Sequence, residues 1–345
     1  MRPRRPVPTV TVMDLRRVDV FDDAELGHLH DVVEAAELHE RPYATPWTIA
    51  EERALFRSVD PAERREIWAV WEGPLMTGVA VLELPLLDNT DMTYVQVHVH
   101  PAHTGRGYGS ALVDLVIHRT KDEGRSTIIT DSAYPFERRE DHPYRLFAER
   151  RGFTLANTEV HRVLDLPVDE QLLASMIEEA APHHAGYSIE RHVGDLPADL
   201  LPSYCHVYNQ LALDAPTGDI DFEAEAITPE VWREREAQLR AARRLRSSVL
   251  ALDGDRQVVG YSDLSIPLDD PQHIHQWGTI VLRDHRGHRL GLALKARNLL
   301  EVQREYPGRT ALHTANAEVN AAMVGINERL GFRPVELYPE FQLKL

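Results

Sequence analysis

The stretch Val95-Gln-Val-His-Val-His-Pro-Ala-His-Thr-Gly-Arg-Gly-Tyr-Gly-Ser-Ala-Leu112 decides the fold. Its alternation of side chains predicts a strand that ends near Pro101, and the run from Gly109 predicts a helix. A glycine-rich turn lies between them. Glycines let the backbone approach a bulky anion, and the free N–H groups of such a turn and of the first helical residues point toward it. The sequence therefore predicts a phosphate site at residues 104–110.

Two common phosphate-binding motifs do not match this turn. The spacing Gly105-x-Gly107-x-Gly109 differs from the G-x-G-x-x-G of dinucleotide-binding folds. No Gly-Lys-Ser/Thr follows it, as a P-loop would require.

The chain also repeats itself. Gly78-Val-Ala-Val-Leu-Glu-Leu-Pro-Leu corresponds to Gly260-Tyr-Ser-Asp-Leu-Ser-Ile-Pro-Leu, and the same interval separates Gly105 from Gly287. Each half shows the same order of predicted strands and helices around the glycine-rich turn, and each has a late helix that ends in Gly-Phe. This order predicts an α+β fold of two tandem domains, each a mixed, mostly antiparallel central sheet flanked by helices.

We place the first domain at residues 1–166, a linker at 167–186 and the second domain at 187–345. Predicted elements include strands over residues 10–13 and 67–71 and helices over 23–39 and 200–213.

Composition restricts the partners. The 345 residues carry a formal net charge of −17, which argues against nucleic-acid binding because phosphate contacts need a basic face. No apolar run is long enough for a membrane span or a secretory signal. The single cysteine, Cys205, excludes an intramolecular disulfide and is expected in the core. We expect a cytoplasmic monomer or homodimer without membrane or nucleic-acid partners and without a bound metal.

The pattern strand–V-x-P-x-x-x-G-x-G-x-G–helix, with a later helix ending in Gly-Phe, resembles the GNAT superfamily of acyl-CoA N-acyltransferases. The resemblance covers nearly the whole chain as two GNAT-like domains, a layout similar to that of mycothiol synthase. It implies direct transfer of an acetyl group from acetyl-CoA (coenzyme A) to an amine, which we expect to be a primary amine of a small molecule.

The resemblance also implies a set of cofactor-binding residues. The turn would bind the pyrophosphate, and the preceding strand would offer backbone groups to the pantetheine arm. In the first half these residues are Val97, His98, Val99, Thr104, Gly105, Arg106, Gly107, Tyr108, Gly109 and Ser110. In the second half they are Arg286, Gly287, His288, Arg289, Leu290 and Gly291, with Asn316 and Asn320 near the final helix.

The two turns differ at the middle glycine. Arg289 replaces the middle glycine of the second turn, where it could clamp a phosphate or block the close approach of the backbone. We therefore expect the first turn to be the principal cofactor site. The second is either a further site or a surface loop that duplication has left behind.

Candidate catalytic residues are less clear. The family often has a Tyr four residues before the glycine of Gly-Phe, but Ala148 and Asn327 stand there. Tyr144 is the nearest substitute for the general acid, or it is simply a core aromatic residue. For the general base, strand alternation puts His98 on the polar face, and a histidine titrates near neutral pH. Glu83 on the preceding strand is the second candidate.

Three further residues are candidates for acceptor binding. His275 alternates with His273 and Trp277 and could line an acceptor pocket. Asp214 and Asp219 lie at the two ends of a loop with turn chemistry. In a GNAT-like domain such a loop would overhang the acceptor cleft, where the two aspartates could hold a cationic substrate; otherwise it is an ordinary turn.

The missing Tyr residues leave an alternative function open. One or both repeats could be catalytically degenerate and bind acyl-CoA as a sensor or scaffold. A third possibility is an interaction protein that recruits partners through its acidic surface, which would leave the repeated cradle unexplained.

Overall fold

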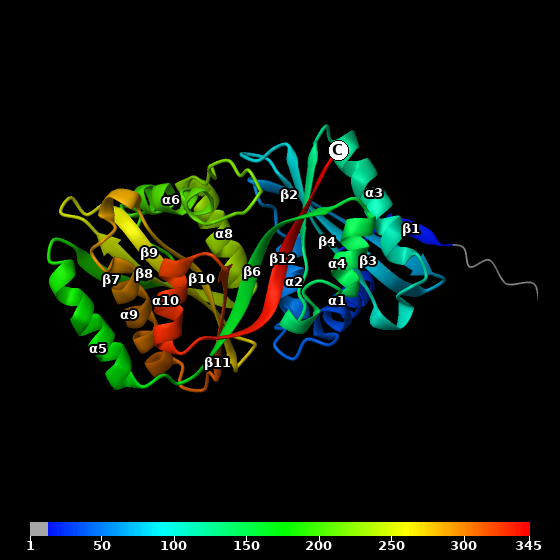
Figure 1. Ribbon diagram of the computed structural model, residues 1–345. Helices are drawn as coiled ribbons and strands as arrows, with labels where there is room; N and C mark the ends of the chain where they lie inside the picture. The colour runs from blue at the N-terminus through cyan, green and yellow to red at the C-terminus, as the bar shows by residue number, and fades with distance from the viewer. Residues whose placement is uncertain (1–12) are drawn as a thin grey trace, which may run out of the picture.

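The computed structural model describes residues 13–345 and forms two lobes joined by long strands (Figure 1). The strands of the first half are β1 (Asp14–Arg17), β2 (Glu63–Glu72), β3 (Leu75–Pro85), β4 (Met92–Val99), β5 (Thr127–Asp131) and β6 (Thr154–Asp165). Its helices are α1 (Asp23–Leu38), α2 (Ile49–Arg57), α3 (Tyr108–Asp122) and α4 (Pro143–Arg150), with short 3-10 turns η1 (Pro101–His103) and η2 (Phe136–Arg138).

The second half repeats this order. Its strands are β7 (Ser188–Val193), β8 (Arg244–Leu252), β9 (Val258–Pro267), β10 (His273–Val281), β11 (Ala311–Ala317) and β12 (Arg333–Lys344). Its helices are α5 (Glu170–Ala180), α6 (Leu201–Asn209), α7 (Leu211–Asp214), α8 (Pro229–Ala241), α9 (Leu290–Glu305) and α10 (Ala321–Leu330), with η3 (Ala181–His183) and η4 (Arg283–His285).

These elements confirm the predicted tandem α+β fold. Among the described strands, only β4–β5 and β10–β11 pair in parallel, and all other neighbours are antiparallel. The strand predicted at 10–13 falls almost wholly on residues outside the described range. The helix predicted over 200–213 is divided into α6 and α7, which meet at Gln210.

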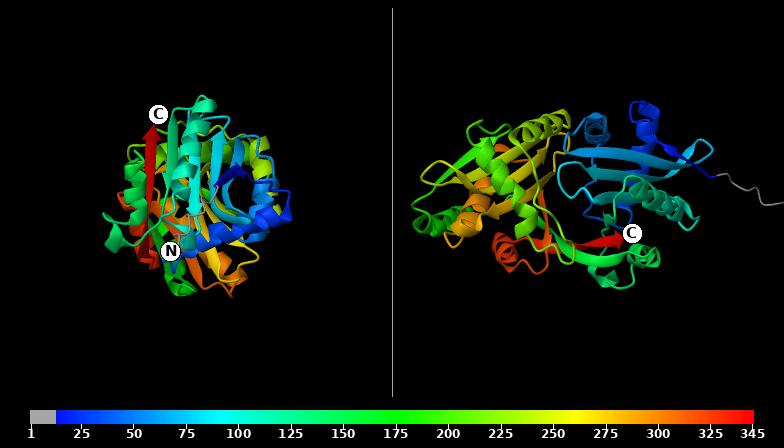
Figure 2. Two further views of the ribbon diagram at one scale, coloured as in Figure 1. Left: turned by 90° about the vertical axis from the view of Figure 1, so that its right-hand side faces the viewer. Right: turned by 90° about the horizontal axis from the view of Figure 1, so that it is seen from above.

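The sheet shows a feature that sequence order does not predict. All twelve described strands form one sheet in the order β1-β2-β3-β4-β5-β12-β6-β11-β10-β9-β8-β7. The last strand of the chain, β12, therefore lies in the first half between β5 and β6, while β6 continues into the second half beside β11. Figure 2 shows β12 in red beside β6 in green as they run between the lobes. Each half thus completes its sheet with a strand of the other.

Helices cover both faces of this sheet. In the first half, Leu29 of α1 packs against Val79 on one face, and Leu112 of α3 packs against Leu82 on the other. In the segment predicted as a linker, 167–186, α5 buries Leu173 in the core of the second half, against α9. This segment is therefore packed against the domain that follows it.

Each half has a gap in its hydrogen-bonded ladder. The parallel pairing of β4 with β5 ends at Val95 opposite Thr130, and β4 then continues to Val99 beside β3 alone. The pairing of β10 with β11 likewise ends at His275 opposite His313. The strands diverge beyond these points, and we call the last pair in each half the vertex of its opening.

The two halves also exchange loops. The loop after α1 reaches the second half, where the Arg244 guanidinium lies 4.7 Å from the ring centroid of Trp47. The loop after α7 reaches the first half, where Phe222 stacks on Tyr94 with 6.4 Å between ring centroids. Each opening is therefore covered partly by the opposite half.

Candidate active site

The first-half turn presents a row of free backbone donors. Gly105 and Gly107 have φ values of +74° and +89°, in the left-handed region that glycine adopts without strain. No described atom outside the neighbouring residues lies within 4 Å of where a Cβ would stand at either glycine. Helix α3 begins directly after Gly107 without a side-chain cap. Among the described residues, the N–H groups of 105–110 have no hydrogen-bond partner.

The side chains around this turn are compatible with an anion. Arg106 is about half exposed and lies 3.6 Å from Glu72, which also accepts a 2.8 Å hydrogen bond from the Tyr108 hydroxyl. The Thr104 hydroxyl donates to the Pro101 carbonyl at 3.2 Å, so it shapes the turn from within. The open backbone, the start of α3 and the Arg106 guanidinium fit the pyrophosphate of coenzyme A.

The second turn keeps the same backbone shape. Gly287 has φ +84° and Arg289 has φ +52°, and Arg289 caps α9 without a side-chain hydrogen bond, as Gly107 does for α3. The Arg289 guanidinium is directed to Glu179 on α5, so its bulk does not fill the turn. His288 contacts the His183 carbonyl at 3.0 Å, and Leu290 is buried. The backbone shape therefore gives no support to the alternative that the second turn is a surface loop left behind by duplication.

Asp214, which was predicted to bind the acceptor, lies at the end of α7 and contacts arginines at the second turn. Its two carboxylate oxygens accept hydrogen bonds of 2.6 Å from Arg283 and Arg286. Arg286 also donates to the Val281 carbonyl at 3.0 Å. Asp219 lies over the first half instead, where its N–H donates to the Ala156 carbonyl at 2.9 Å. The structure does not bring these two aspartates together.

A cavity of about 180 Å³ lies at the first vertex. Three carboxylates line it, each from a different strand: Glu83 from β3, Asp131 from β5 and Glu340 from β12. Tyr94 and Gln96 of β4 complete its polar wall. Burial raises the pKa of Glu340, although Asn157 donates to it at 2.6 Å and opposes that shift.

Asp131 occupies an unusual position in this cavity. Asp131 is exposed to solvent at this cavity, but the protein packed around the opening still desolvates its carboxyl, which raises its pKa. Glu83 adds to that effect by charge repulsion, while the Arg41 guanidinium opposes it. Sequence reasoning identified Glu83 but missed Asp131 and Glu340, because only the pairing of β5 with β12 sets Asp131 opposite Glu340.

The other predicted catalytic residues lie nearby but do not line this cavity. Burial, with a smaller contribution from Arg41, lowers the pKa of His98 to about 4, so its ring is neutral at pH 7. Its Nε2 is buried without a hydrogen-bond partner among the described residues. Tyr144 on α4 packs edge-on against the His142 ring, with centroids 4.6 Å apart. The catalytic roles of His98 and Tyr144 stay predictions.

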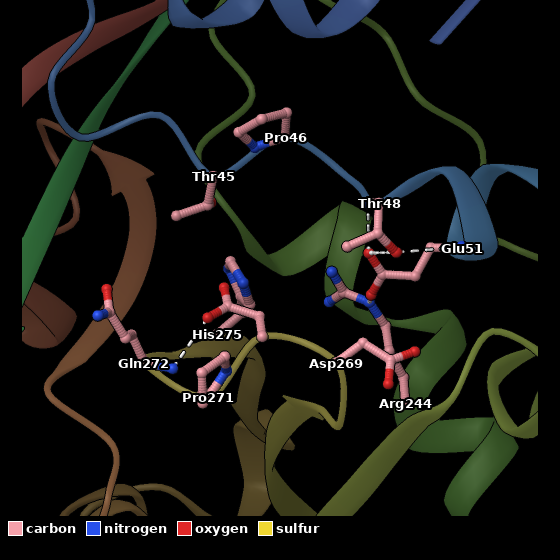
Figure 3. A pocket seen from close by; sticks show the side chains of 10 residues that line it. Thr45, Pro46, Thr48, Glu51, Arg244, Asp269, Pro271, Gln272 and His275 are labelled. Atoms are coloured by element: carbon pink, nitrogen blue, oxygen red, sulfur yellow. Dashed lines mark hydrogen bonds and ion pairs between the residues drawn. The ribbon is translucent and has the colours of Figure 1, made fainter. Parts of the chain in front are cut away.

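A second cavity, of about 350 Å³, lies between the lobes (Figure 3). Its upper wall comes from the first-half loop that carries Thr45 and Thr48, and its lower wall from the second half, which contributes His275. Glu51 and Arg244 close one side through a buried 2.6 Å ion pair. The predicted acceptor-pocket residue His275 therefore lines a cavity, and burial lowers the pKa of its ring to about 3.

The predicted asparagines serve different purposes. Asn320 caps α10 through the N–H of Met323 at 3.3 Å. Asn316 accepts from Asn327 at 3.1 Å, and Asn327 in turn accepts from the buried Lys295 ammonium at 2.9 Å. The position where the family often has Tyr is thus part of a buried polar network in the second half.

Comparisons with known proteins agree with this fold. Residues 32–153 match the acetyltransferase (GNAT) family. The chain is similar to a tandem GNAT protein from the clavulanic acid biosynthesis pathway, in a structure without AcCoA, with 24% identity, a TM-score of 0.76 and coverage of 96% of this chain and 98% of that one. It is also similar to a GCN5-related N-acetyltransferase from Sphaerobacter thermophilus, with 14% identity, a TM-score of 0.63 and coverage of 96% and 95%.

A search of curated proteins gives no match. Of the helices in the described part of the chain, none is long and apolar enough to cross a membrane.

Proposed function

We propose that the protein is an acetyl-CoA-dependent N-acetyltransferase, because residues 32–153 match the acetyltransferase (GNAT) family and the whole chain has the fold of a tandem GNAT protein. It transfers an acetyl group directly to a primary amine of a small molecule in a ternary complex. The observation that carries the proposal is the placement of an open phosphate cradle and a carboxylate-lined cavity around one strand, β4, in the first half.

The first-half residues have distinct tasks in this proposal. The N–H groups of 105–110 and the Arg106 guanidinium hold the pyrophosphate. The edge of β4 from 97 to 99, which no strand covers on the side of β5, offers backbone groups to the pantetheine arm. When bound, acetyl-CoA supplies an activated acyl carbon that an unprotonated amine can attack.

In this proposal the cavity binds the amine as an ammonium ion and removes a proton from it. Three carboxylates attract an ammonium ion, which cannot attack until it loses a proton. We assign the proton acceptor to Asp131, because a carboxyl whose pKa is raised matches a general base near neutral pH better than an ordinary one. Glu83 and Glu340 then hold the remaining positive charge. His98, whose pKa is lowered to about 4, is the weaker base.

The test follows release of the CoA thiol with a thiol reagent while acetyl-CoA is offered with aminoglycosides, polyamines, amino acids and peptides in turn. We expect acetylated product, confirmed by mass spectrometry, with at least one cationic amine. Gly107→Trp should abolish binding to the first cradle, because the indole fills the space that the anion needs.

The matched control is Gly124→Trp. Gly124 also has a left-handed φ, +70°, and open surroundings, but it lies beyond the other end of α3. This variant should bind acetyl-CoA as the wild-type chain does. Unchanged affinity in Gly107→Trp, or no turnover with any amine, would refute the proposal.

One observation favours a second function, that of an acyl-CoA sensor or scaffold. Ala148 and Asn327 occupy both positions where the family often has a Tyr acid, and Asn327 is engaged in a buried network. Thermal stabilisation by CoA without turnover on any amine would identify this function.

A further inference from the structure

The cavity of about 350 Å³ between the lobes is separate from the first vertex, where the amine is proposed to bind. Its upper wall is the first-half loop that carries Thr45 and Pro46, and its lower wall is the second-half loop 269–272 together with His275 of β10. Figure 3 shows Thr45 and Pro46 facing His275 and Pro271 across the cavity. Its volume lies in the range of small-molecule binding sites. The chemistry of its walls indicates the kind of molecule that fits.

The charged side chains of this cavity already have partners within the protein. One oxygen of Glu51 accepts a hydrogen bond of 2.6 Å from Arg244 Nε, and the other accepts one of 2.7 Å from the Thr48 N–H. Both oxygens of Asp269 lie 2.9 Å from Arg243 Nε. Each of these charges is therefore balanced before any ligand arrives.

Asp270 is also fully engaged. Its Oδ2 lies 2.7 Å from His273 Nδ1, and its Oδ1 accepts from the N–H groups of Gln272 and His273 at 2.9 and 3.2 Å. Burial opposes the charge, but these hydrogen bonds outweigh it and lower the pKa of the Asp270 carboxyl. An ionic ligand would have to compete for countercharges that are already bound, which disfavours it in this cavity.

The polar groups that stay free in this cavity are uncharged. Among residues 13–345, the Thr45 hydroxyl, the Gln272 side-chain amide and the His275 ring have no hydrogen-bond partner, and all three line the cavity. Burial, with a smaller contribution from Arg244, lowers the pKa of His275 to about 3, so its ring is neutral at pH 7. A hydroxyl, an amide and a neutral imidazole can each donate and accept a hydrogen bond.

Such a set of groups matches a ligand whose own polar groups both donate and accept. A carboxylate only accepts and an ammonium only donates, so either ion uses half of what these three side chains offer. Hydroxyl groups use both halves. Pro46 and Pro271 add apolar surface on the two walls, against which the C–H face of a sugar or cyclitol ring can pack.

A buried chain of hydrogen bonds holds the two walls in place. The His275 ring packs 5.5 Å from the His313 ring, and His313 Nδ1 lies 3.0 Å from His161 Nε2. His161 Nδ1 lies 2.9 Å from Glu336, whose two oxygens accept hydrogen bonds of 3.0 Å from Arg41. Arg41 belongs to the loop of the upper wall, so this chain connects the upper wall to the lower one. A cavity fixed in this way loses little conformational entropy when a ligand binds.

We propose that the cavity between the lobes is a binding site for a small, uncharged, polyhydroxylated molecule, a sugar or a cyclitol, whose hydroxyl groups bind Thr45, Gln272 and His275. Because Thr45 belongs to the first half and the other two residues to the second, the ligand bridges the lobes. The first vertex differs, since the carboxylates that line its cavity favour a cation.

The first test measures binding to the wild-type chain at pH 7 without acetyl-CoA and without turnover. The neutral set is glucose, galactose, N-acetylglucosamine, sucrose, trehalose and myo-inositol, each offered at up to about 10 mM in saturation-transfer NMR and titration calorimetry. We expect at least one of them to bind saturably. Its amine and carboxylate derivatives, such as glucosamine and glucuronate for glucose, should bind at least about tenfold more weakly. No binding by any neutral member, or tighter binding by a charged derivative, would overturn the proposal.

The second test locates the ligand. Thr45→Val and Gln272→Leu each remove hydrogen-bonding groups from one wall, and each should raise the Kd of the bound sugar about tenfold. Because the two residues lie on opposite walls, the double variant should raise it about 100-fold. Urea unfolding checks that the variants are folded. In the wild-type chain, the ring nitrogens of His275 should shift in proton–nitrogen NMR spectra when the sugar is added. An unchanged Kd in both single variants would refute the assignment.

The matched control is Gln171→Leu. Gln171 is an exposed glutamine in the first turn of α5, lines neither cavity, and its replacement should leave the Kd of the sugar unchanged. Gln96→Leu alters the first cavity instead. Weaker sugar binding in Gln96→Leu together with unchanged binding in Gln272→Leu would place the ligand at the first vertex and overturn the proposal. Sugar binding by a chain that acetylates no amine would support this inference while refuting the proposed function.

Discussion

The pKa of Lys295 reports how tightly the second half is packed around its side chain. It lies on α9, is 3% exposed, and donates to Asn327 Oδ1 at 2.9 Å. Its other close neighbours are the Met323 sulfur at 3.7 Å and the ring of Phe332, whose centroid is 5.6 Å away. With no carboxylate to balance the charge, burial lowers the pKa of Lys295 from 10.5 to about 7.

This lowered pKa determines whether the free energy of unfolding rises or falls with pH. Below pH 7 the folded and unfolded chains both carry the proton, and the buried charge destabilises the fold in full. Between pH 7 and 10.5 the unfolded chain keeps the proton while the folded chain releases it, so the free energy of unfolding rises with pH. The difference between the pKa of 10.5 in the unfolded chain and about 7 in the folded chain changes the free energy of unfolding by at most about 5 kcal/mol.

The perturbation is Lys295→Met, which fills the same space without a charge. Urea unfolding from pH 6 to 9.5 should show the variant to be several kcal/mol more stable at pH 6, with the difference shrinking as the pH rises. Taking the difference between wild type and variant cancels groups that both share, such as Cys205, whose thiol pKa burial raises to about 11. Lys121→Met, an exposed lysine on α3, is the control and should change stability little at any pH.

Parallel stability curves for the wild-type chain and Lys295→Met would refute this reasoning. They would mean that Lys295 is solvated in the folded chain, and the buried network with Asn327 would have to be abandoned.

Three further predictions concern the two halves. Arg41→Met leaves Glu336 buried without its cation and should lower the free energy of unfolding at pH 7 by about 3 kcal/mol, measured in urea, whereas a change below about 1 kcal/mol would contradict the buried pair. Deleting residues 333–345 should abolish CoA binding at the first cradle, because β12 lies between β5 and β6; calorimetry that still finds this site would contradict the shared sheet. Titration calorimetry should find two CoA sites in the wild-type chain and one in either Gly107→Trp or Gly287→Trp, and an unchanged count in Gly287→Trp would make the second turn a non-binding loop.

Local features were predictable from the sequence. Left-handed backbone at Gly105 and Gly107 follows from the residue type, and the order of elements follows from the repeat. Even the replacement of the middle glycine by Arg289 could be identified as a point of difference between the two turns. Its outcome could not, because the side chain turns toward Glu179, which lies more than a hundred residues earlier in the chain.

The acceptor cavities were only partly predictable. Alternation along β4 put His98 on the polar face, and Glu83 was chosen as its neighbour across β3. Asp131 and Glu340 were missed because strand order, which carries no local signal, sets β12 beside β5. The chain His161–His313 was missed for the same reason, since its members pair only where β6 crosses into the second half.

The exchange of strands explains why two similar folds can have different acceptor sites. In each half the strand beside the opening is a strand of the other half: β12 brings Glu340 to the first vertex, and β6 brings His161 to the second. A change in one strand therefore alters the site of the opposite half without disturbing its own cradle. The two glycine-rich turns have kept a similar backbone shape, while carboxylates line the cavity at the first vertex and two histidines, His275 and His313, form the second vertex. This division predicts that the two halves share an acyl donor but differ in the acceptors they select.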